Sequence, residues 1–179
     1  MTYYGGKEMA AAFRTVRNNT LTIAEEIPES QYGFKPSPDT RSIGGTLTHI
    51  ALLPAFQSYI QGRKVTDLKE VPFGDIVKEM MIEEAKPRTK AEIIAFLKSE
   101  ADKFEAFLNG LSEAFLAEQV TMPPGDTRTS KSRLEMLLSV KEHEMHHRAQ
   151  LMLMQRMIGQ VPHLTRARMA QFAAAPATR

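Results

Sequence analysis

The chain has 179 residues, and we expect residues 1–179 to form one domain, because a second domain would need a core of its own. The formal net charge is only +2 and the basic residues are scattered, which excludes the basic stripe of a typical nucleic-acid-binding surface. No cysteine is present, so disulfides, thiolate nucleophiles and iron–sulfur clusters are excluded.

No apolar run approaches the roughly 20 residues that a membrane-spanning helix requires. The first residues, Met1 to Gly6, lack the basic start and apolar stretch of a signal peptide. We therefore expect a cytoplasmic protein that binds neither membranes nor nucleic acid.

Apolar side chains that recur every three or four residues predict the first two helices. The first covers Gly6–Ile27 and ends where Pro28 interrupts it. A loop rich in turn-forming residues follows, and Ser42 is the expected N-cap of a second helix that runs to about Ile60. Pro54 lies inside this second helix, where it removes one backbone hydrogen bond.

The third helix follows a long connection, Gly62–Arg88, in which we predict one helical turn around Asp75–Glu84. Thr89 and Glu92 have the spacing of a capping box, so a third helix is predicted from Thr89 to about Leu108.

After a second long connection, Gly110–Ser130, either Ser130 or Ser132 is expected to cap the fourth helix. This helix runs to about Ile158, and Gly159 is placed to end it in the left-handed conformation.

A short C-terminal helix is predicted at Thr165–Phe172, and the residues from Ala173 onward are expected to be frayed. These elements predict an all-α fold, a four-helix bundle whose long connections make it different from a simple up-and-down bundle. A fold built on a sheet is disfavoured, because the period-2 alternation of strands is nearly absent.

Two histidines, His143 and His147, occur four residues apart in the fourth helix. A spacing of four turns a helical side chain by only about 40°, so both rings project from one face. The apolar residues of this helix lie on the same face. The second helix likewise carries His49 on its apolar face.

A single histidine on an apolar stripe is most often a hydrogen-bonded core residue. Three on two helices are better explained by one divalent metal ion, because a zinc-like catalytic site takes three protein ligands and keeps one open position. The sequence therefore predicts His49, His143 and His147 as metal ligands.

The other polar residues near this pair have less defined roles. His146 lies about 60° from His143 on the wheel, and we consider His146 and Arg148 as possible substrate contacts. Candidates to orient a ligand ring are Glu142, Glu144 and Gln150, although each of them is also a reasonable surface residue. His163, outside the fourth helix, is predicted to be a surface residue.

The string His143-Glu144-Met145-His146-His147 formally matches the His-Glu-x-x-His motif of zinc proteases. Those enzymes usually take a third ligand from downstream and hold the substrate on a strand. Here only His163 lies downstream and no strand is evident, so a protease is disfavoured.

The order and spacing of two stretches resemble the DinB/YfiT-like superfamily of metalloenzymes. Residues 41–49, Arg-Ser-Ile-Gly-Gly-Thr-Leu-Thr-His, are similar to the family's approach to its first metal histidine. Residues 143–150, His-Glu-Met-His-His-Arg-Ala-Gln, are similar to its histidine–Arg-Gly-Gln signature, and residues 34–36, Phe-Lys-Pro, also match. One departure is Ala149, where the family often has glycine; it adds a methyl group and removes no ligand.

The resemblance covers nearly the whole chain and implies an antiparallel four-helix bundle, a three-histidine site that commonly holds zinc or nickel, and frequent homodimers. It also implies a small-molecule substrate, since characterised relatives are S-transferases or an isomerase that use low-molecular-weight thiols.

Three functions stay open at this stage. The first is a thiol-dependent S-transferase that acts on a small electrophile through a metal-activated thiolate, and the second is a metal-dependent hydrolase that uses metal-bound hydroxide. The third is a non-catalytic, metal-stabilised binding module, which would hold its ion in a closed site. A second apolar stripe on the fourth helix, opposite the histidines, predicts either packing within the bundle or a homodimer surface; it comprises Leu134, Leu138, Met145 and Met152.

Overall fold

The structure is a computed structural model that describes residues 4–174. Its elements follow in chain order as α1 (Gly6–Glu26), the 3-10 turn η1 (Glu29–Gln31), α2 (Ile43–Gly62), the 3-10 turn η2 (Leu68–Glu70), α3 (Phe73–Glu84), α4 (Lys90–Asn109), α5 (Glu113–Ala117), β1 (Gln119–Thr121), β2 (Ser130–Ser132), α6 (Arg133–Met157) and α7 (His163–Ala174).

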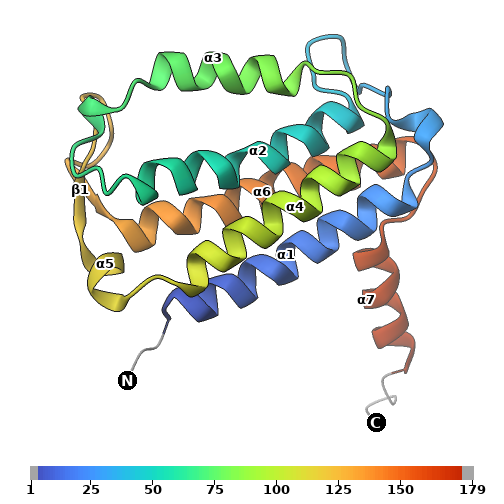
Figure 1. The fold of residues 1–179 in the computed structure, drawn as a ribbon. Helices are drawn as coiled ribbons and strands as arrows, with labels where there is room; N and C mark the ends of the chain where they lie inside the picture. Colours follow the sequence, from blue (N-terminus) through green and yellow to red (C-terminus); the bar gives the residue numbers. More distant parts are fainter. Residues whose placement is uncertain (1–3, 175–179) are drawn as a thin grey trace.

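Four long helices, α1, α2, α4 and α6, form the predicted bundle (Figure 1). Both α1 and α2 pack against α4 and α6, so the order around the bundle is α1, α4, α2, α6. The colours of Figure 1 show that α1 and α6 run in one direction while α2 and α4 run in the other. The contacts α1–α4 and α2–α6 are therefore antiparallel, and the connectivity differs from a simple up-and-down bundle, as predicted.

The helix ends follow the local chemistry of the sequence. The hydroxyls of Ser42, Thr89 and Ser132 each accept a hydrogen bond from a first-turn amide of the helix that follows, and Thr89 completes the predicted capping box with Glu92. Gly159, at φ +84°, ends α6. The amide of the next residue, Gln160, donates to the Gln155 carbonyl at 2.8 Å, which is the C-terminal glycine motif expected there.

Two clusters of buried side chains make up most of the bundle core. One lies between α1, α2, α4 and α6 at the end where α2 begins, and includes Ile43, Leu47, Leu97 and Leu151. The other lies where α1 begins and α4 ends, and includes Phe13 and Phe104.

The second apolar stripe of α6 packs largely within the bundle. Leu134 and Leu138 pack against the core cluster around Phe13, and Met152 packs against the cluster at the other end. Met145 is 43% exposed.

The connection between α2 and α4 contains a 12-residue helix, α3, so the prediction of a single turn was wrong. Pro72 occupies the N-cap position, where no intrahelical amide hydrogen bond is needed, and therefore does not prevent the helix. Phe73, Ile76 and Met80 are partly buried at helical spacing, and α3 packs on the outside of α2. Its direction brings Glu84, the last residue, next to the start of α2 (Figure 1).

The connection between α4 and α6 holds a small antiparallel sheet in which Gln119 pairs with Ser132 and Thr121 with Ser130. Each strand has three residues, which is too short for a period-2 pattern to appear in the sequence. The all-α fold class stands, with this hairpin added at one end of the bundle (Figure 1).

The C-terminal helix α7 is longer than predicted and projects from the end of the bundle (Figure 1). His163 is its first residue and is partly buried, and its Nε2 lies 3.2 Å from Asn19 Oδ1 on α1. Its prediction as a surface residue was therefore wrong. Ala173 and Ala174, predicted to be frayed, belong to α7, and the rest of that prediction falls on residues 175–179, which lie outside the described part of the chain.

Within residues 4–174, every helix is too short or too polar to cross a membrane.

Candidate metal centre

The rings of His49, His143 and His147 meet where α2 packs against α6. His143 Nε2 lies 3.1 Å from His49 Nε2 and 3.1 Å from His147 Nε2. One ring nitrogen from each of the three lies within 4.8 Å of the others. The convergence predicted from helical spacing is therefore present, with His147 buried and the other two rings partly buried.

Two of the three rings have a hydrogen-bond partner on the side that faces away from the cluster. His49 Nδ1 lies 2.9 Å from Glu84 Oε2, and His147 Nδ1 lies 2.7 Å from Gln150 Oε1. Because both partners are acceptors, each Nδ1 carries the proton and each Nε2 presents a lone pair to the cluster. Outer partners of this kind are typical of metal-binding histidines.

The geometry fits a divalent cation. The Nε2 lone pairs of His49 and His147 point at the centre of the cluster. The neutral His143 ring has its Nε2 3.1 Å from both, so one proton or one ion fits between the three nitrogens. Three nitrogen donors on two rigid helices are a donor set that zinc, nickel, copper and iron(II) all accept. The Nδ1 atom of His143 is buried and has no hydrogen-bond partner among residues 4–174.

Glu84 was not anticipated from the sequence, because it lies on a segment for which we predicted a connection with one helical turn. Its carboxylate also accepts a hydrogen bond from Arg41 Nε. Burial raises the pKa of Glu84, but the hydrogen bonds with Arg41 and His49 outweigh this and lower the pKa below its usual value. Glu84 is therefore ionised and able to hold the Nδ1 proton of His49.

Among the predicted orienting residues, Gln150 contacts a ligand ring, whereas Glu142 is exposed and makes no contact with a ligand ring in the described structure. Glu144 was expected to be either an orienting or a surface residue, and it is neither. It is 1% exposed and forms an ion pair with Arg17 of α1, on the far side of α6 from the cluster.

Neither of the two predicted substrate contacts is among the residues that line the cavity next to the cluster. His146 is exposed, and its Nε2 lies 3.2 Å from Gln150 Nε2. Arg148 points toward α1, where its Nη1 lies 3.5 Å from the Val16 carbonyl oxygen. A substrate contact by either residue stays a prediction.

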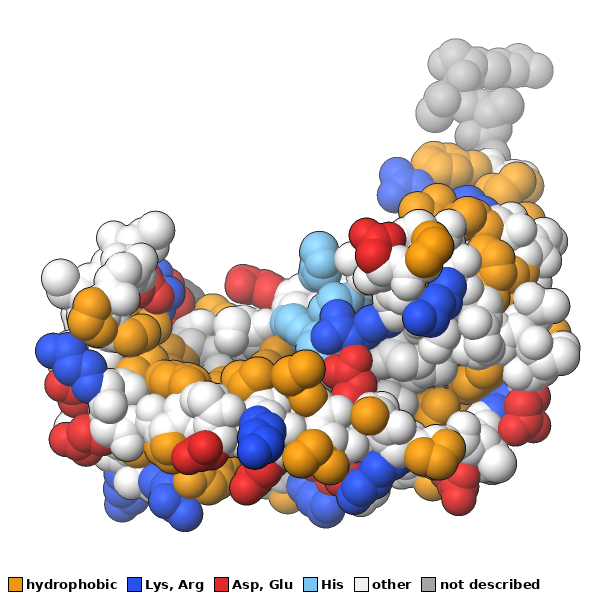
Figure 2. All heavy atoms as spheres, turned by 90° about the horizontal axis from the view of Figure 1, so that it is seen from above, with side chains coloured by type: hydrophobic (Ala, Val, Ile, Leu, Met, Phe, Trp, Pro, Cys, Tyr) orange, Lys and Arg blue, Asp and Glu red, His pale blue; other side chains and the backbone are white. Residues whose placement is uncertain are grey.

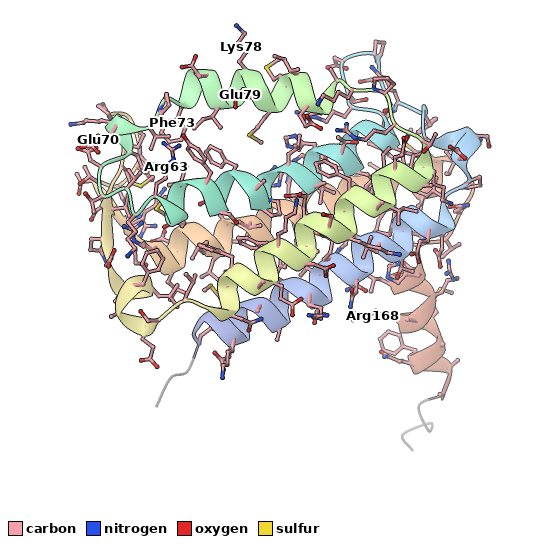
Figure 3. All side chains as sticks on the ribbon, in the orientation of Figure 1. Arg63, Glu70, Phe73, Lys78, Glu79 and Arg168 are labelled. Atoms are coloured by element: carbon pink, nitrogen blue, oxygen red, sulfur yellow. The ribbon has the colours of Figure 1, made fainter. Side chains whose placement is uncertain are left out.

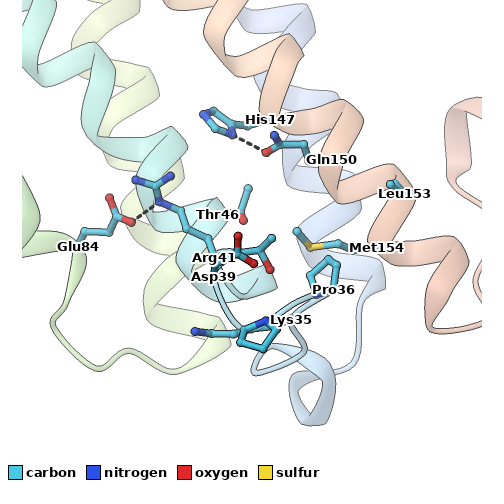
Figure 4. Close-up of a pocket in the computed structure, with 12 residues that line it drawn as sticks. Lys35, Pro36, Asp39, Arg41, Thr46, Glu84, His147, Gln150, Leu153 and Met154 are labelled. Carbon is cyan, nitrogen blue, oxygen red and sulfur yellow. Dashed lines mark hydrogen bonds and ion pairs between the residues drawn. The ribbon is translucent and has the colours of Figure 1, made fainter.

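That cavity has a volume of about 700 Å³ and adjoins the cluster at His147. Its walls come from the loop before α2, from Thr46 of α2, from Glu84 of α3, and from Gln150, Leu153 and Met154 of α6 (Figure 4). In the space-filling view, which shows the molecule from above, histidine side chains reach the surface beside a hollow (Figure 2). An ion held by the three rings would therefore have an accessible side.

Removing the partner of His49 should weaken metal binding without removing a ligand. We expect Glu84→Ala to lower the affinity for zinc by about 10–100-fold, the usual cost of losing an outer partner. Competition with a chromogenic chelator measures this change. The matched control is Glu83→Ala, one residue earlier, whose carboxylate pairs with Lys86 and Arg88; equal losses in both variants would contradict the assignment.

The histidine cluster should make the metal-free protein sensitive to acid. Burial, together with the nearby His147 and His49, lowers the pKa of His143 from its usual 6.5 to about 4. Burial also lowers the pKa of His147, against an opposing effect of its hydrogen bond to Gln150. Because the unfolded chain then binds protons at a higher pH than the folded one, stability should fall as the pH decreases from 6.5 toward 4.

Urea unfolding of the metal-free protein across this pH range measures the effect. His143→Asn should flatten the dependence, and an unchanged slope in that variant would show that other groups cause it.

Comparisons with known proteins agree with this architecture. Residues 12–151 match the DinB superfamily. The uncharacterized Bacillus subtilis protein YjoA is 24% identical over 155 residues, which cover 85% of this chain and 90% of YjoA. The crystal structure of YjoA, a DinB-like protein, superposes with a TM-score of 0.64 at 21% identity, covering 86% of this chain and 94% of that one.

A second solved structure is YfiT from Bacillus subtilis, described as a probable metal-dependent hydrolase with an unusual four-helix bundle topology. It superposes with a TM-score of 0.65 at 15% identity and covers 89% of this chain and 91% of its own. At this identity the likeness supports the fold. Since the family match spans most of the chain, this protein belongs to the DinB superfamily.

Proposed function

We propose that the protein is a metal-dependent enzyme whose ion is held by His49, His143 and His147. The observation that carries the proposal is the convergence of three imidazoles, two with fixed tautomers, beside an open cavity. A divalent cation, zinc or nickel on family grounds, would supply Lewis acidity and lower the pKa of a water or thiol that it binds.

The protein's own residues account for the rest of the site. Glu84 and Gln150 hold the rings of His49 and His147 so that Nε2 faces the centre. Burial keeps His143 and His147 neutral near pH 7, the form in which imidazole binds metals. The cavity next to His147 gives a small molecule access to the ion's open side.

For the reaction we propose thiol transfer to a small electrophile. The thiol sulfur forms a bond to an electrophilic carbon, the leaving group departs with the electron pair of the broken bond, and the thiol proton passes to solvent. The chain has no cysteine, so a low-molecular-weight thiol must enter from solution. The cavity, at about 700 Å³, has the volume of a small-molecule site.

Hydrolysis, with water as the nucleophile, is the second candidate, and the description of YfiT as a probable metal-dependent hydrolase favours it. The third candidate, a binding module with an occluded ion, is less well supported, because the cavity adjoins the cluster.

A substrate screen on the zinc- and nickel-loaded protein separates these candidates. Small electrophiles are tested with and without added thiol, and simple esters and amides with water alone, each against a His143→Ala control. Turnover that needs both the metal and the thiol supports transfer, whereas thiol-independent turnover supports hydrolysis. Full metal content without any turnover would overturn both reactions in favour of the binding module.

A further inference from the structure

Two basic side chains line the cavity beside the histidine cluster, and the proposed function does not use either of them. Lys35 and Arg41 both belong to the loop before α2. In Figure 4, His147 lies at one end of the group of lining residues and Lys35 lies at the other. A molecule that fills the cavity would therefore contact the cluster at one end and a cation at the other.

The loop that carries these cations is held by its own hydrogen bonds. Pro36 and Pro38 fix two backbone φ angles. Thr40 Oγ1 donates to the Ser37 carbonyl at 2.7 Å and accepts from the Ser37 amide at 3.2 Å. Lys35 and Arg41 flank this closed turn, so the backbone that presents them is ordered before any ligand binds.

The anionic groups in the cavity wall already have partners. Glu84 accepts one hydrogen bond from Arg41 Nε and has His49 as its second partner. Asp39 accepts a hydrogen bond from the Ser37 hydroxyl. Neither carboxylate pairs with Lys35 within residues 4–174, and Asp39 keeps its negative charge, since a hydroxyl donor does not neutralise it.

The donors of the two cations, by contrast, are available. The Lys35 ammonium makes no hydrogen bond or ion pair within the described residues, and the two terminal nitrogens of Arg41 likewise find no partner there. First-turn amides of α2 cannot serve as donors instead, because Gly44 donates to the Tyr32 carbonyl and Gly45 to the Ser42 hydroxyl. The side chains of Lys35 and Arg41 are therefore the charged donors that the loop offers to an anion in this cavity.

We propose that Lys35 binds an anionic group of the substrate, a carboxylate or a phosphate, at the end of the cavity away from the histidine cluster. The reacting end of the same molecule would reach the cluster, where the Arg41 guanidinium beside Glu84 adds a second positive charge. The apolar wall of Leu153 and Met154 would contact the part between them. Only the part of this inference that concerns the reacting end of the substrate rests on the proposed function. The substrate class is small anionic molecules, since an ammonium in the cavity wall that has no partner within residues 4–174 favours such groups.

Lys35→Gln tests the proposal, because it removes the charge and leaves the contacts of Arg41 with Glu84 in place. The matched control is Lys78→Gln, an exposed lysine that points away from the bundle on α3 (Figure 3). The probes are 2-mercaptosuccinate and uncharged 1-thioglycerol, titrated by calorimetry into the zinc-loaded proteins at constant ionic strength.

The wild type and Lys78→Gln should bind mercaptosuccinate more tightly than thioglycerol. Lys35→Gln should lose about 10-fold in affinity for mercaptosuccinate, the usual contribution of one charge-assisted hydrogen bond, and little for thioglycerol. Equal losses for both thiols, or no loss for either, would overturn the anionic subsite.

A second measurement does not depend on the metal. Succinate and inorganic phosphate are titrated into the metal-free proteins and followed by the amide NMR shifts of the non-proline residues between 35 and 41. Saturable shifts that disappear in Lys35→Gln support the subsite even if the protein proves not to bind metal, and the stronger of the two ligands identifies the preferred anion. Identical shifts in wild type and Lys35→Gln would refute it while leaving the metal centre untouched.

Discussion

His143→Ala is expected to leave the purified protein without stoichiometric metal. His143 Nε2 lies between the other two ligand nitrogens, at 3.1 Å from each, so its loss removes the central donor of the site. The affinity should fall by more than the roughly 10–100-fold that loss of an outer partner costs. Elemental analysis of protein purified from zinc- or nickel-supplemented cultures measures the change.

The matched control is His146→Ala, three residues further along α6. His146 is exposed and its ring lies 4.8 Å from the ring of His147, yet it is not one of the three converging residues. This variant should retain full metal content. Loss of metal in His146→Ala together with retention in His143→Ala would refute the assignment of ligands.

Arg17→Met is expected to destabilise the fold by about 3–5 kcal/mol, because it leaves the carboxylate of Glu144 buried without a counter-ion. Arg17 and Glu144 are each 1% exposed. The guanidinium makes three hydrogen bonds to Glu144, between 2.9 and 3.1 Å, and Nη1 also donates to the Leu97 carbonyl at 2.7 Å. Nη2 lies 3.4 Å from the Ile50 carbonyl.

These bonds connect all four bundle helices behind the histidine cluster. Ile50 directly follows His49, and Glu144 directly follows His143. The buried ion pair therefore fixes the two helices at the positions from which the ligands project. We expect Arg17→Met to weaken metal binding as well as stability.

Urea unfolding of the metal-free protein measures the stability change. Arg14→Met is the matched control, since Arg14 lies on the same helix and pairs with Glu105 at the surface, where such a pair contributes about 0–1 kcal/mol. In the double variant Arg17→Met/Glu144→Met, stability should partly recover, because no unpaired charge remains buried. Equal effects of Arg14→Met and Arg17→Met would contradict the role of the buried pair.

The features that the sequence predicts well are those with a local physical cause. Helix ends follow from caps such as Ser42 and Thr89, and the shared direction of His143 and His147 follows from helical geometry alone. The pairing with His49 could be predicted because each helix carries its histidines on the apolar face.

Features that depend on how the helices pack were missed. Glu84 contacts His49 from 35 positions away, and Glu144 contacts Arg17 from 127 positions away. One signal was available for the second contact: Arg17 falls four residues after Phe13 and three before Thr20, inside the apolar stripe of α1. A charged residue in such a stripe predicts a buried partner, although it does not identify that partner.

X-ray absorption spectroscopy at the zinc or nickel edge tests the central claim most directly, because it reports the atoms bound to the ion. The three-histidine centre predicts imidazole nitrogens at about 2.0–2.1 Å from zinc, with the multiple-scattering pattern of histidine rings, and loss of that pattern in His143→Ala. A first shell made of oxygen atoms alone, or the same imidazole signal in His143→Ala, would contradict the site described for this protein.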